Sequence, residues 1–296
     1  MAALWLAGPA PIRRPAQLVT ARAAPVLQTD GVPGERYAPE QRLAFGRVAE
    51  LYHRVRPPYP PAAIDAVLEY GRLAPPARIV EVGAGTGRAT GLFADRGLAV
   101  LALEPSADMA AVARAHCARY PDVEIIETEF ERWQPGEPLT ACVSVQAWHW
   151  IAPEVRYRKA HDALAPGGTL AAIWMLPDWD RCVLREPLSE AYRATVPDLA
   201  ADFPMHPDSE PTRLAGDWHA ELAASGRFHS AQVRALPWAQ KYASAAYPEL
   251  LQTHQDHILL ADEPRTELMR AITETIDRAG GNLEVPFMTY VCLARR

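Results

Sequence analysis

The chain has 296 residues, of which 49% are hydrophobic, so it can bury a full core as one large domain or two smaller ones. Its 36 acidic and 30 basic residues give a formal net charge of −6, which argues against a protein that tracks duplex nucleic acid with a basic face. Four widely separated cysteines form no C-x-x-C pair, so we expect neither a zinc ribbon nor a disulfide framework. We therefore expect the protein to be cytoplasmic, where cysteines stay reduced.

Residues 1–36 are rich in proline and alanine and contain three arginines before the first acidic residue. This composition favours a poorly ordered tail, with an organellar transit peptide as the alternative. The apolar start at residues 1–7 is too short for a membrane span and has no basic residue before it, so we expect neither a signal peptide nor a membrane anchor. We therefore place the folded domain at residues 37–296.

The first structured segment is predicted to be a helix over residues 39–52, followed by a proline-rich elbow at 53–60 and a second helix at 61–70 that ends at Gly71. The elbow has two interpretations. Tyr52, Arg56 and Tyr59 could face a ligand, with the guanidinium available for a carboxylate. Alternatively, the elbow is a solvent-facing connection.

A glycine-rich turn, Glu81-Val-Gly-Ala-Gly-Thr-Gly87, follows a short apolar strand and precedes a helix predicted at 88–96. A carboxylate is unexpected in a buried strand unless it lies at the carboxyl end, where open α/β sheets bind ligands. We expect Gly83 to allow the reversal, Gly85 to let a ligand approach the backbone, and Gly87 to let the helix start close to the sheet.

The next apolar run, residues 98–103, ends in Glu104, about twenty residues after the first glycine of the turn. A carboxylate at this offset can accept hydrogen bonds from both hydroxyls of a ribose. Pro105 and Ser106 precede a helix predicted at 107–119. Met109, in its first turn, could pack on an adenine or belong to the core.

The spacing of the glycines separates two nucleotide classes. A dinucleotide fingerprint, G-x-G-x-x-G, would place a glycine at position 88, where this chain has Arg88. The turn instead reads acid-x-G-x-G-x-G, which disfavours a nicotinamide oxidoreductase.

Two further strands are predicted at 123–127 and 139–145, and the second opens into Gln146-Ala-Trp-His-Trp150. Two indoles and an imidazole at a strand end can surround a cation, although we expect Trp148 or Trp150 to pack on the helix predicted at 153–164. His149 could act as a general base or simply order the loop by hydrogen bonding.

After a turn predicted at 165–168, a strand is predicted at 169–175 that contains Trp174, followed by helices at 185–195 and 214–225. The rest of the chain is predicted to form an antiparallel pair of strands at 228–236 and 285–294, with helices at 243–260 and 264–279 between them. His254 and His257 share one helical face. Because Asp256 lies off that face, pocket-lining or solvated side chains are favoured over a metal site.

These motifs together resemble the class I S-adenosylmethionine (SAM)-dependent methyltransferases, and within them the small-molecule branch of trans-aconitate methyltransferase-like proteins. The resemblance covers about residues 45–175: the elbow, the glycine turn, Glu104, and the stretches 127–133, 145–150 and 164–170. It implies a Rossmann-like doubly wound α/β fold, with a seven-stranded, mostly parallel sheet whose last strand is antiparallel. The core would be residues 72–176 and 226–296, with lid elements at 37–71 and 178–225.

The resemblance also implies roles for individual residues. Glu81, Gly83, Gly85 and Gly87 would hold the methionine end of SAM, Glu104 the ribose, and Glu129 and Phe130 the adenine, while Gln146 and Ala147 would line the wall near the sulfonium. We add Tyr52, Arg56, Ala84, Pro105 and Met109 to the predicted cofactor site. The predicted substrate-binding residues are Tyr59, Trp148, Trp150, Trp174, His254 and His257, with His149 as the candidate base and no metal.

The sequence therefore predicts methyl transfer from SAM to an oxygen, nitrogen or carbon of a small molecule, such as a carboxylate or hydroxyl, with S-adenosylhomocysteine as the second product. The protein would mainly align donor and acceptor and exclude water. Three alternatives remain: a non-methylating rearrangement or cyclisation on the same fold, an NAD(P) oxidoreductase, and a non-catalytic SAM-binding protein. We expect no nucleic-acid or membrane partner, and the oligomeric state stays open.

Overall fold

The computed structural model describes residues 17–18, 46, 48–202 and 211–296. The predicted tail at 1–36 therefore lies outside the described residues, apart from one two-residue strand. None of the described helices combines the length and the apolar character that a membrane crossing requires.

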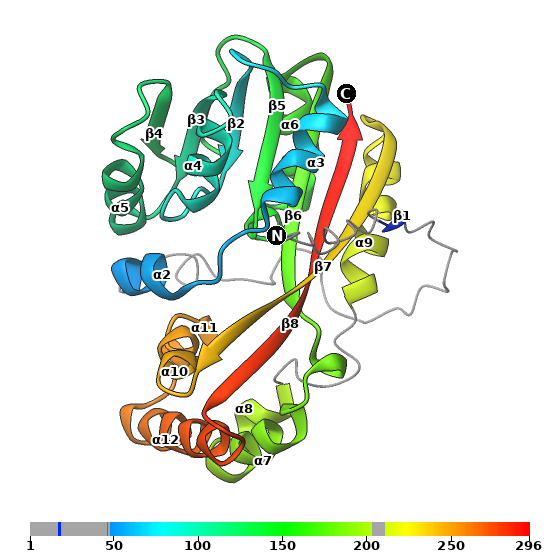
Figure 1. The fold of residues 1–296 in the computed structure, drawn as a ribbon. Coiled ribbons are helices and arrows are strands. Elements are labelled where there is room, and N and C mark those ends of the chain that lie inside the picture. The colour runs from blue at the N-terminus through cyan, green and yellow to red at the C-terminus, as the bar shows by residue number, and fades with distance from the viewer. Residues whose placement is uncertain (1–16, 19–45, 47, 203–210) are drawn as a thin grey trace, which may run out of the picture.

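Eight strands form one mixed sheet in the order β1-β7-β8-β6-β5-β2-β3-β4 (Figure 1). The strands are β1 Gln17–Leu18, β2 Arg78–Val82, β3 Ala99–Glu104, β4 Val123–Glu127, β5 Leu139–Val145, β6 Leu164–Pro177, β7 His229–Ala243 and β8 Asn282–Arg295. Strands β4, β3, β2, β5 and β6 run parallel, β8 is antiparallel to β6, and β7 is antiparallel to β8. The predicted seven-stranded arrangement with an antiparallel last strand is confirmed.

The helices follow the predicted alternation with the strands. They are α2 Ala49–Val55, α3 Pro61–Gly71, α4 Arg88–Ala94, α5 Ala107–Cys117, α6 Pro153–Ala163, α7 Arg185–Thr195, α8 Pro197–Asp202, α9 Pro211–Ser225, α10 Ala246–Leu251, α11 Gln255–Ile258 and α12 Asp262–Arg278, with the 3₁₀ turns η2 Trp148–Trp150 and η3 Trp179–Arg181. Pro61 and Pro153 open α3 and α6, where a missing backbone N–H costs nothing.

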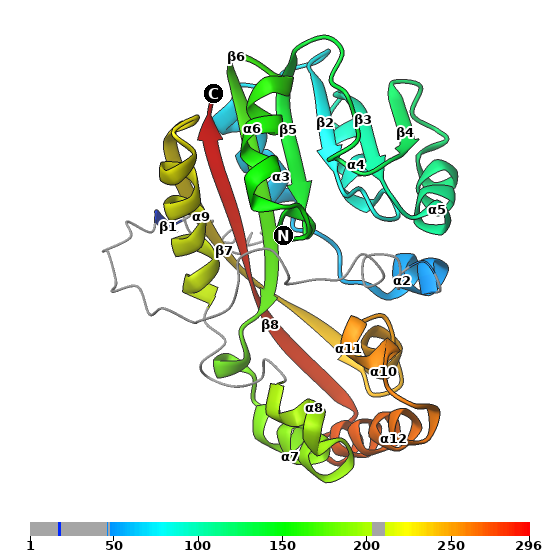
Figure 2. The ribbon, with the colours of Figure 1, turned by 180° about the vertical axis from the view of Figure 1, so that it is seen from behind.

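Two layers of helices cover the sheet, as the views from both sides show (Figures 1 and 2). Helices α3 and α4 pack on one face through an apolar cluster that contains Ile64, Phe93 and Ile79. Helices α6 and α9 pack on the other face, where Tyr157 and Trp218 join Val80 from the sheet. Successive residues of β2 thus face opposite layers, and the strand is buried on both sides as its apolar sequence predicts.

The strands β6, β7 and β8 are long and continue beyond the parallel part of the sheet, where they carry a second group of helices (Figure 1). Helices α7, α10 and α12 bury a separate apolar cluster there, including Leu188, Leu251 and Ile272, against the end of β8. The parallel sheet and this helical group share the same long strands.

Several element boundaries differ from the sequence predictions. Helix α2 continues through Val55 rather than ending at Tyr52, because the first helix-breaking proline is Pro57. The residue in the left-handed conformation after α3 is Arg72, with φ 51°, rather than Gly71. The helix predicted at 243–260 is two short helices, because β7 extends to Ala243 and the chain turns again between α10 and α11.

The sheet also has a strand that the sequence did not predict. In β1, Gln17 lies opposite Ala235 of β7 in antiparallel register. A strand of two residues is too short to show the alternation of apolar and polar residues by which strands are predicted, so no sequence pattern could have indicated it. Helix α9, part of the predicted lid segment 178–225, packs with α6 on the face of the sheet, whereas α7 and α8 lie with the second helical group.

Candidate functional site

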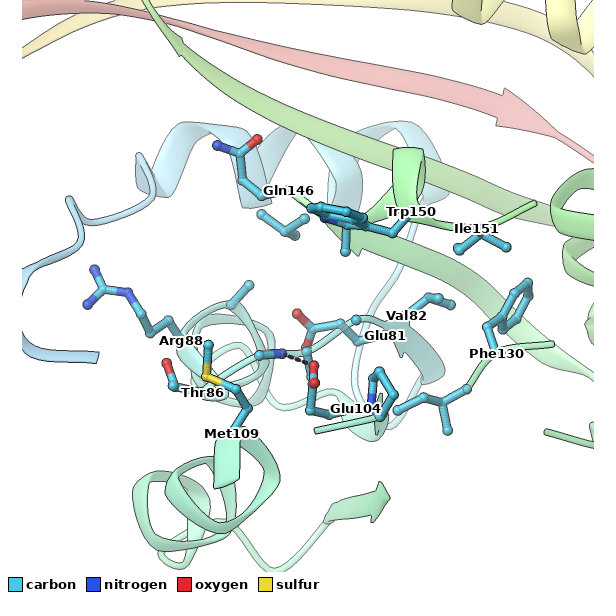
Figure 3. A pocket seen from close by; sticks show the side chains of 18 of the residues that line it. Glu81, Val82, Thr86, Arg88, Glu104, Met109, Phe130, Gln146, Trp150 and Ile151 are labelled. Carbon is cyan, nitrogen blue, oxygen red and sulfur yellow. Dashed lines mark hydrogen bonds between the residues drawn. The ribbon is translucent and has the colours of Figure 1, made fainter. Parts of the chain in front are cut away.

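A cavity of about 280 Å³ lies at the carboxyl ends of β2, β3 and β5 (Figure 3). Its floor is the glycine turn after β2 and the end of β3, and Trp150 and Ile151 lie on the opposite side. The elbow after α2 closes one end, and the segment after β4 supplies Thr128 to Glu131 at the other. The cavity thus occupies the edge of the sheet where open α/β folds bind ligands.

Gly83 and Gly85 of the turn are required for different reasons. Both have positive φ, 72° and 57°. A Cβ on Gly83 would lie 2.3 Å from the Cβ of Ala147, so the turn packs directly against the chain that leaves β5. A Cβ on Gly85 would meet nothing within 4 Å, although the residue lines the cavity. The backbone at Gly85 therefore leaves space that a ligand could fill, as the sequence predicts.

Gly87 does not do what the sequence predicted. A Cβ there would lie 3.0 Å from Cys117 Sγ and 3.2 Å from Ala113, both in α5. The glycine therefore allows α4 to begin close to a neighbouring helix rather than to the sheet, and Gly87 does not line the cavity.

Glu104 joins the two sides of the cavity floor. Its Oε2 accepts a hydrogen bond from the backbone N–H of Gly85 at 2.8 Å (Figure 3). Its Oε1 accepts one from the N–H of Ser106 at 2.9 Å. Burial raises the pKa of this carboxyl, and the two N–H groups counteract that rise by stabilising the carboxylate. Each carboxylate oxygen keeps a further lone pair for a ligand hydroxyl.

Glu81 lies at the end of β2 and is 1% exposed. Its Oε2 accepts a hydrogen bond from the hydroxyl of Thr90 in α4 at 2.6 Å. Burial raises the pKa of Glu81 to about 8; the Thr90 hydroxyl lowers it and the charge of Glu104 raises it further. Glu81 is therefore largely protonated at neutral pH and can ionise when a cationic group arrives.

This protonation makes stability depend on pH. Between the ordinary carboxyl pKa of 4.5 and a folded value of about 8, the folded state holds a proton that the unfolded state has released. The free energy of unfolding of the ligand-free protein should therefore fall as pH rises through this range. Replacing Glu81 with glutamine keeps an acceptor for Thr90 and should flatten the slope, so that at pH 8 the variant is more stable than the wild type by ~4 kcal/mol. Urea unfolding between pH 5.5 and 8.5 measures this, and parallel pH profiles would contradict it.

The strand end after β5 is held by the amide of Gln146. This residue has φ 61°, which is unusual for a side chain other than glycine. Its Nε2 donates to the Met175 carbonyl at 2.8 Å, and its Oε1 accepts from the Met175 N–H at 3.2 Å. The side chain thus continues the pairing with β6 and turns away from Glu104 (Figure 3). Gln146 contributes to the cavity wall by fixing the backbone that carries Ala147 and His149.

His149 lies in the cavity wall with a defined tautomer. The indole N–H of Trp174 donates to His149 Nδ1 at 3.2 Å, and an indole nitrogen can only donate. The neutral imidazole must therefore carry its hydrogen on Nε2. Burial, helped by the nearby Arg156 guanidinium, lowers the pKa of His149 to about 4. His149 is therefore neutral at physiological pH, but a pKa of about 4 makes it a weak proton acceptor, which is unfavourable for a general base.

Trp148, which follows Ala147, points away from the cavity into the apolar layer. It is 1% exposed and packs against Tyr157 of α6 and Trp218 of α9. The expectation that one of the two indoles packs on the next helix is confirmed. Arg156 of α6 donates to the carbonyls of Trp148 and Ile151 and forms an ion pair with Glu221 of α9. A buried cation thereby anchors the turn that presents Trp150.

The elbow faces the cavity with Tyr52, Arg56 and Tyr59. Arg56 lies over the ring of Tyr52, 4.6 Å from its centroid, and donates to the hydroxyl and carbonyl oxygens of Thr253 at 2.9 and 2.7 Å. The interpretation of the elbow as a solvent-facing connection is wrong, because these side chains line a cavity and bind a residue nearly 200 positions away.

The other predicted site residues divide into two groups. Most line the cavity: in addition to those above, these are Ala84, Pro105, Met109, Glu129 and Phe130. Trp174, His254 and His257 are absent from the lining, as are Gly87 and Trp148. Trp174 lies behind His149. His257 is fully buried and bonds Tyr192 through Nε2 at 2.7 Å, with the His254 ring 5.7 Å away. The described residues contain no group of three metal-ligating side chains.

Sequence reasoning missed several lining residues. These are Val82, Thr86, Arg88, Ala89, Leu103, Thr128, Glu131, Val145 and Ile151. Five of these nine residues are apolar. Thr86 and Arg88 could be predicted from the sequence, since both lie in or beside the glycine turn.

Comparisons with known proteins agree with this geometry. The family model described as "Methyltransferase domain" matches residues 79–168. An uncharacterized methyltransferase of Mycobacterium tuberculosis (strain ATCC 25618 / H37Rv) is 36% identical over 139 residues, 47% of this chain and 55% of that protein. The trans-aconitate 2-methyltransferase of Streptomyces avermitilis is 31% identical over 147 residues, 47% of this chain and 54% of that protein. The matches thus span about half the length of these curated relatives.

Solved structures show the same fold. A provisionally assigned methyltransferase from an antibiotic biosynthesis pathway of Anabaena variabilis has a TM-score of 0.54 and 19% identity, and covers 80% of this chain and 98% of that one. A provisionally assigned type II methyltransferase from Anaeromyxobacter dehalogenans has a TM-score of 0.51 and 20% identity, covering 81% and 97%. Taken together with the glycine turn and the sheet order, the family match identifies residues 79–168 as a methyltransferase domain within the Rossmann-like fold of the class I methyltransferases.

Proposed function

We propose that this protein transfers the methyl group of SAM to a small-molecule acceptor. The observation that carries the proposal is the cavity in which the glycine turn and Glu104 face an aromatic strand end. Its volume of about 280 Å³ is close to the lower limit typical of small-molecule sites, so the cavity suits small-molecule ligands.

The residues present fit SAM. Gly85 leaves space that a Cβ would fill, and Glu104 offers carboxylate oxygens suited to ribose hydroxyls. Thr86 Oγ1 is buried beside the cavity and has no hydrogen-bond partner. A ligand that formed a hydrogen bond with this hydroxyl would remove the free-energy cost of leaving it unpaired. Glu81 can ionise to match a cationic amino group. Met109 and Phe130 supply apolar surface for a base.

SAM supplies an activated methyl group when it is bound, so the protein needs no covalent intermediate. The task of the chain is to align the acceptor and exclude water. Tyr52, Tyr59 and Trp150 are the aromatic lining residues at the elbow and the strand end, and their ring faces can surround a positive charge. Arg56, fixed over Tyr52 by Thr253, limits the cavity on that side.

We propose His149 as a hydrogen-bonding residue of this wall rather than the base that the sequence suggested. The amide of a glutamine at this position has a carbonyl oxygen that can accept from the Trp174 N–H and an NH₂ group that can donate, but it cannot act as a base. His149→Gln should therefore keep activity within about tenfold, whereas loss of a general base typically costs 10²–10⁴-fold. The wild-type rate should also show no ionisation near pH 6.5 from this residue. A loss of 100-fold or more in His149→Gln, at unchanged stability, would restore the base.

The acceptor can be sought among small organic acids and alcohols, because the relative from Streptomyces avermitilis is named for trans-aconitate. The test incubates the purified protein with SAM and a panel of such compounds and measures S-adenosylhomocysteine and methylated product together. Equimolar formation of both supports methyl transfer. Conversion of an acceptor without S-adenosylhomocysteine would instead show a rearrangement, and activity restricted to nucleic acid or protein would contradict a small-molecule acceptor.

A further inference from the structure

Arg88 makes contacts that neither the fold nor the proposed reaction explains. It is the first residue of α4, immediately after the glycine turn, and it lines the cavity. Its guanidinium reaches across to the elbow. Nη1 donates to the carbonyl of His53 at 2.5 Å, and Nη2 donates to the carbonyls of Arg56 and Pro57 at 2.7 and 2.9 Å.

The elbow needs such a donor. His53 belongs to the last turn of α2, whose carbonyls have no partner within the helix, and a cation at this end also complements the helix dipole. Pro57, Pro58 and Pro60 have no backbone N–H, so the segment cannot satisfy its own carbonyls by forming a regular turn. One planar guanidinium supplies three hydrogen bonds that the elbow cannot make internally.

The elbow is fixed on its other side as well. Arg56 donates to Thr253, which is fully buried and whose hydroxyl donates to the Leu250 carbonyl at 2.6 Å. The elbow therefore connects the glycine turn, through Arg88, to helix α10, through Thr253. Tyr52, Arg56 and Tyr59 are the side chains that this connection holds in the cavity wall.

We propose that Arg88 is a positioning residue that clamps the elbow onto the glycine turn and so sets the wall formed by Tyr52, Arg56 and Tyr59. The position of this wall is then determined by the same turn that forms the cavity floor. Loss of Arg88 leaves three carbonyls without donors and frees α2 and the elbow to move away, while the core of the sheet keeps its packing. The effect on ligand affinity rests on the proposed function, whereas the effect on the elbow does not.

The test compares Arg88→Met with Arg96→Met. Arg96 is a matched control, because it also lies beside α4 and donates to a nearby carbonyl, that of Pro61 at 3.2 Å, but it does not line the cavity. Hydrogen exchange of the ligand-free proteins should show faster exchange of the α2 amides in Arg88→Met only. Calorimetry should show SAM affinity reduced about tenfold or more in Arg88→Met and within twofold of wild type in Arg96→Met.

Arg88→Lys tests whether the planar geometry of the guanidinium matters apart from its positive charge. An ammonium group keeps the charge but cannot reproduce the fork, so α2 should exchange at a rate between those of the wild type and Arg88→Met. Wild-type exchange in Arg88→Met or Arg88→Lys, or equal acceleration in Arg96→Met, would overturn the clamp. If the wild-type protein binds no SAM, the proposed function fails, but the exchange comparison still decides the role of Arg88.

Discussion

Glu104→Ala should reduce the affinity for SAM by about 2–3 kcal/mol, equivalent to ~30- to 150-fold. The carboxylate is expected to accept hydrogen bonds from the ribose, and it already accepts two from the backbone, at Gly85 and Ser106. Alanine removes all of these acceptors. The loss should therefore combine a missing ligand contact with a less ordered glycine turn, and a modest decrease in melting temperature should accompany it.

Glu127→Ala is the control for this change. Glu127 ends β4, next to β3 in the sheet and directly opposite Glu104 in the parallel register, but it does not line the cavity. Calorimetry should give wild-type SAM affinity for this variant. If Glu104→Ala bound SAM as tightly as the wild type, or if both variants lost affinity equally, the ribose site would be misplaced.

Alanine at Gly83 and alanine at Gly85 should fail in different ways. At Gly83 the new Cβ would meet Ala147 at 2.3 Å in a left-handed backbone, and we expect a loss of about 3 kcal/mol or more in the free energy of unfolding. At Gly85 the Cβ would meet no protein atom, so only the left-handed conformation is penalised, by about 1–2 kcal/mol. Its methyl group would instead occupy space in the cavity and reduce ligand binding.

Urea unfolding and calorimetry on the two variants measure both quantities. The expected pattern is a large stability loss for Gly83→Ala, and a small stability loss with at least tenfold weaker SAM binding for Gly85→Ala. Double replacement of Gly83 and Ala147, as Gly83→Ala with Ala147→Gly, should recover part of the lost stability because it removes the contacting Cβ. Equal stability losses in the two single variants would contradict the assigned geometry.

The parallel half of the sheet could be predicted from the sequence because its signals are local. Buried strands such as β5 are mostly apolar, the glycine turn follows its strand directly, and Glu104 ends its strand. The long end of β7 beyond residue 236 could not be predicted, because it pairs with β8 at separations of 39 residues or more. The position of α9 depends in the same way on the packing of Trp218 against α6.

In the candidate site, too, local features could be predicted from the sequence and contacts between distant segments could not. Residues at strand ends were found because their position follows from the fold, and sixteen of the predicted side chains and turn residues line one cavity. Contacts between distant segments were not readable, such as Arg56 with Thr253 or Arg88 with the elbow. The role of His149 could not be inferred from its own position either, since its tautomer depends on Trp174 in the neighbouring strand.

The proposed function requires that the cavity above the glycine turn binds SAM. Titration calorimetry of the purified wild-type protein with S-adenosylhomocysteine and, separately, with NAD and NADP tests it most directly, with Glu104→Ala as the paired sample. We expect one S-adenosylhomocysteine to bind per chain, at least 30-fold more weakly after Glu104→Ala, and neither dinucleotide to bind. Binding of NAD or NADP with none of S-adenosylhomocysteine would contradict it.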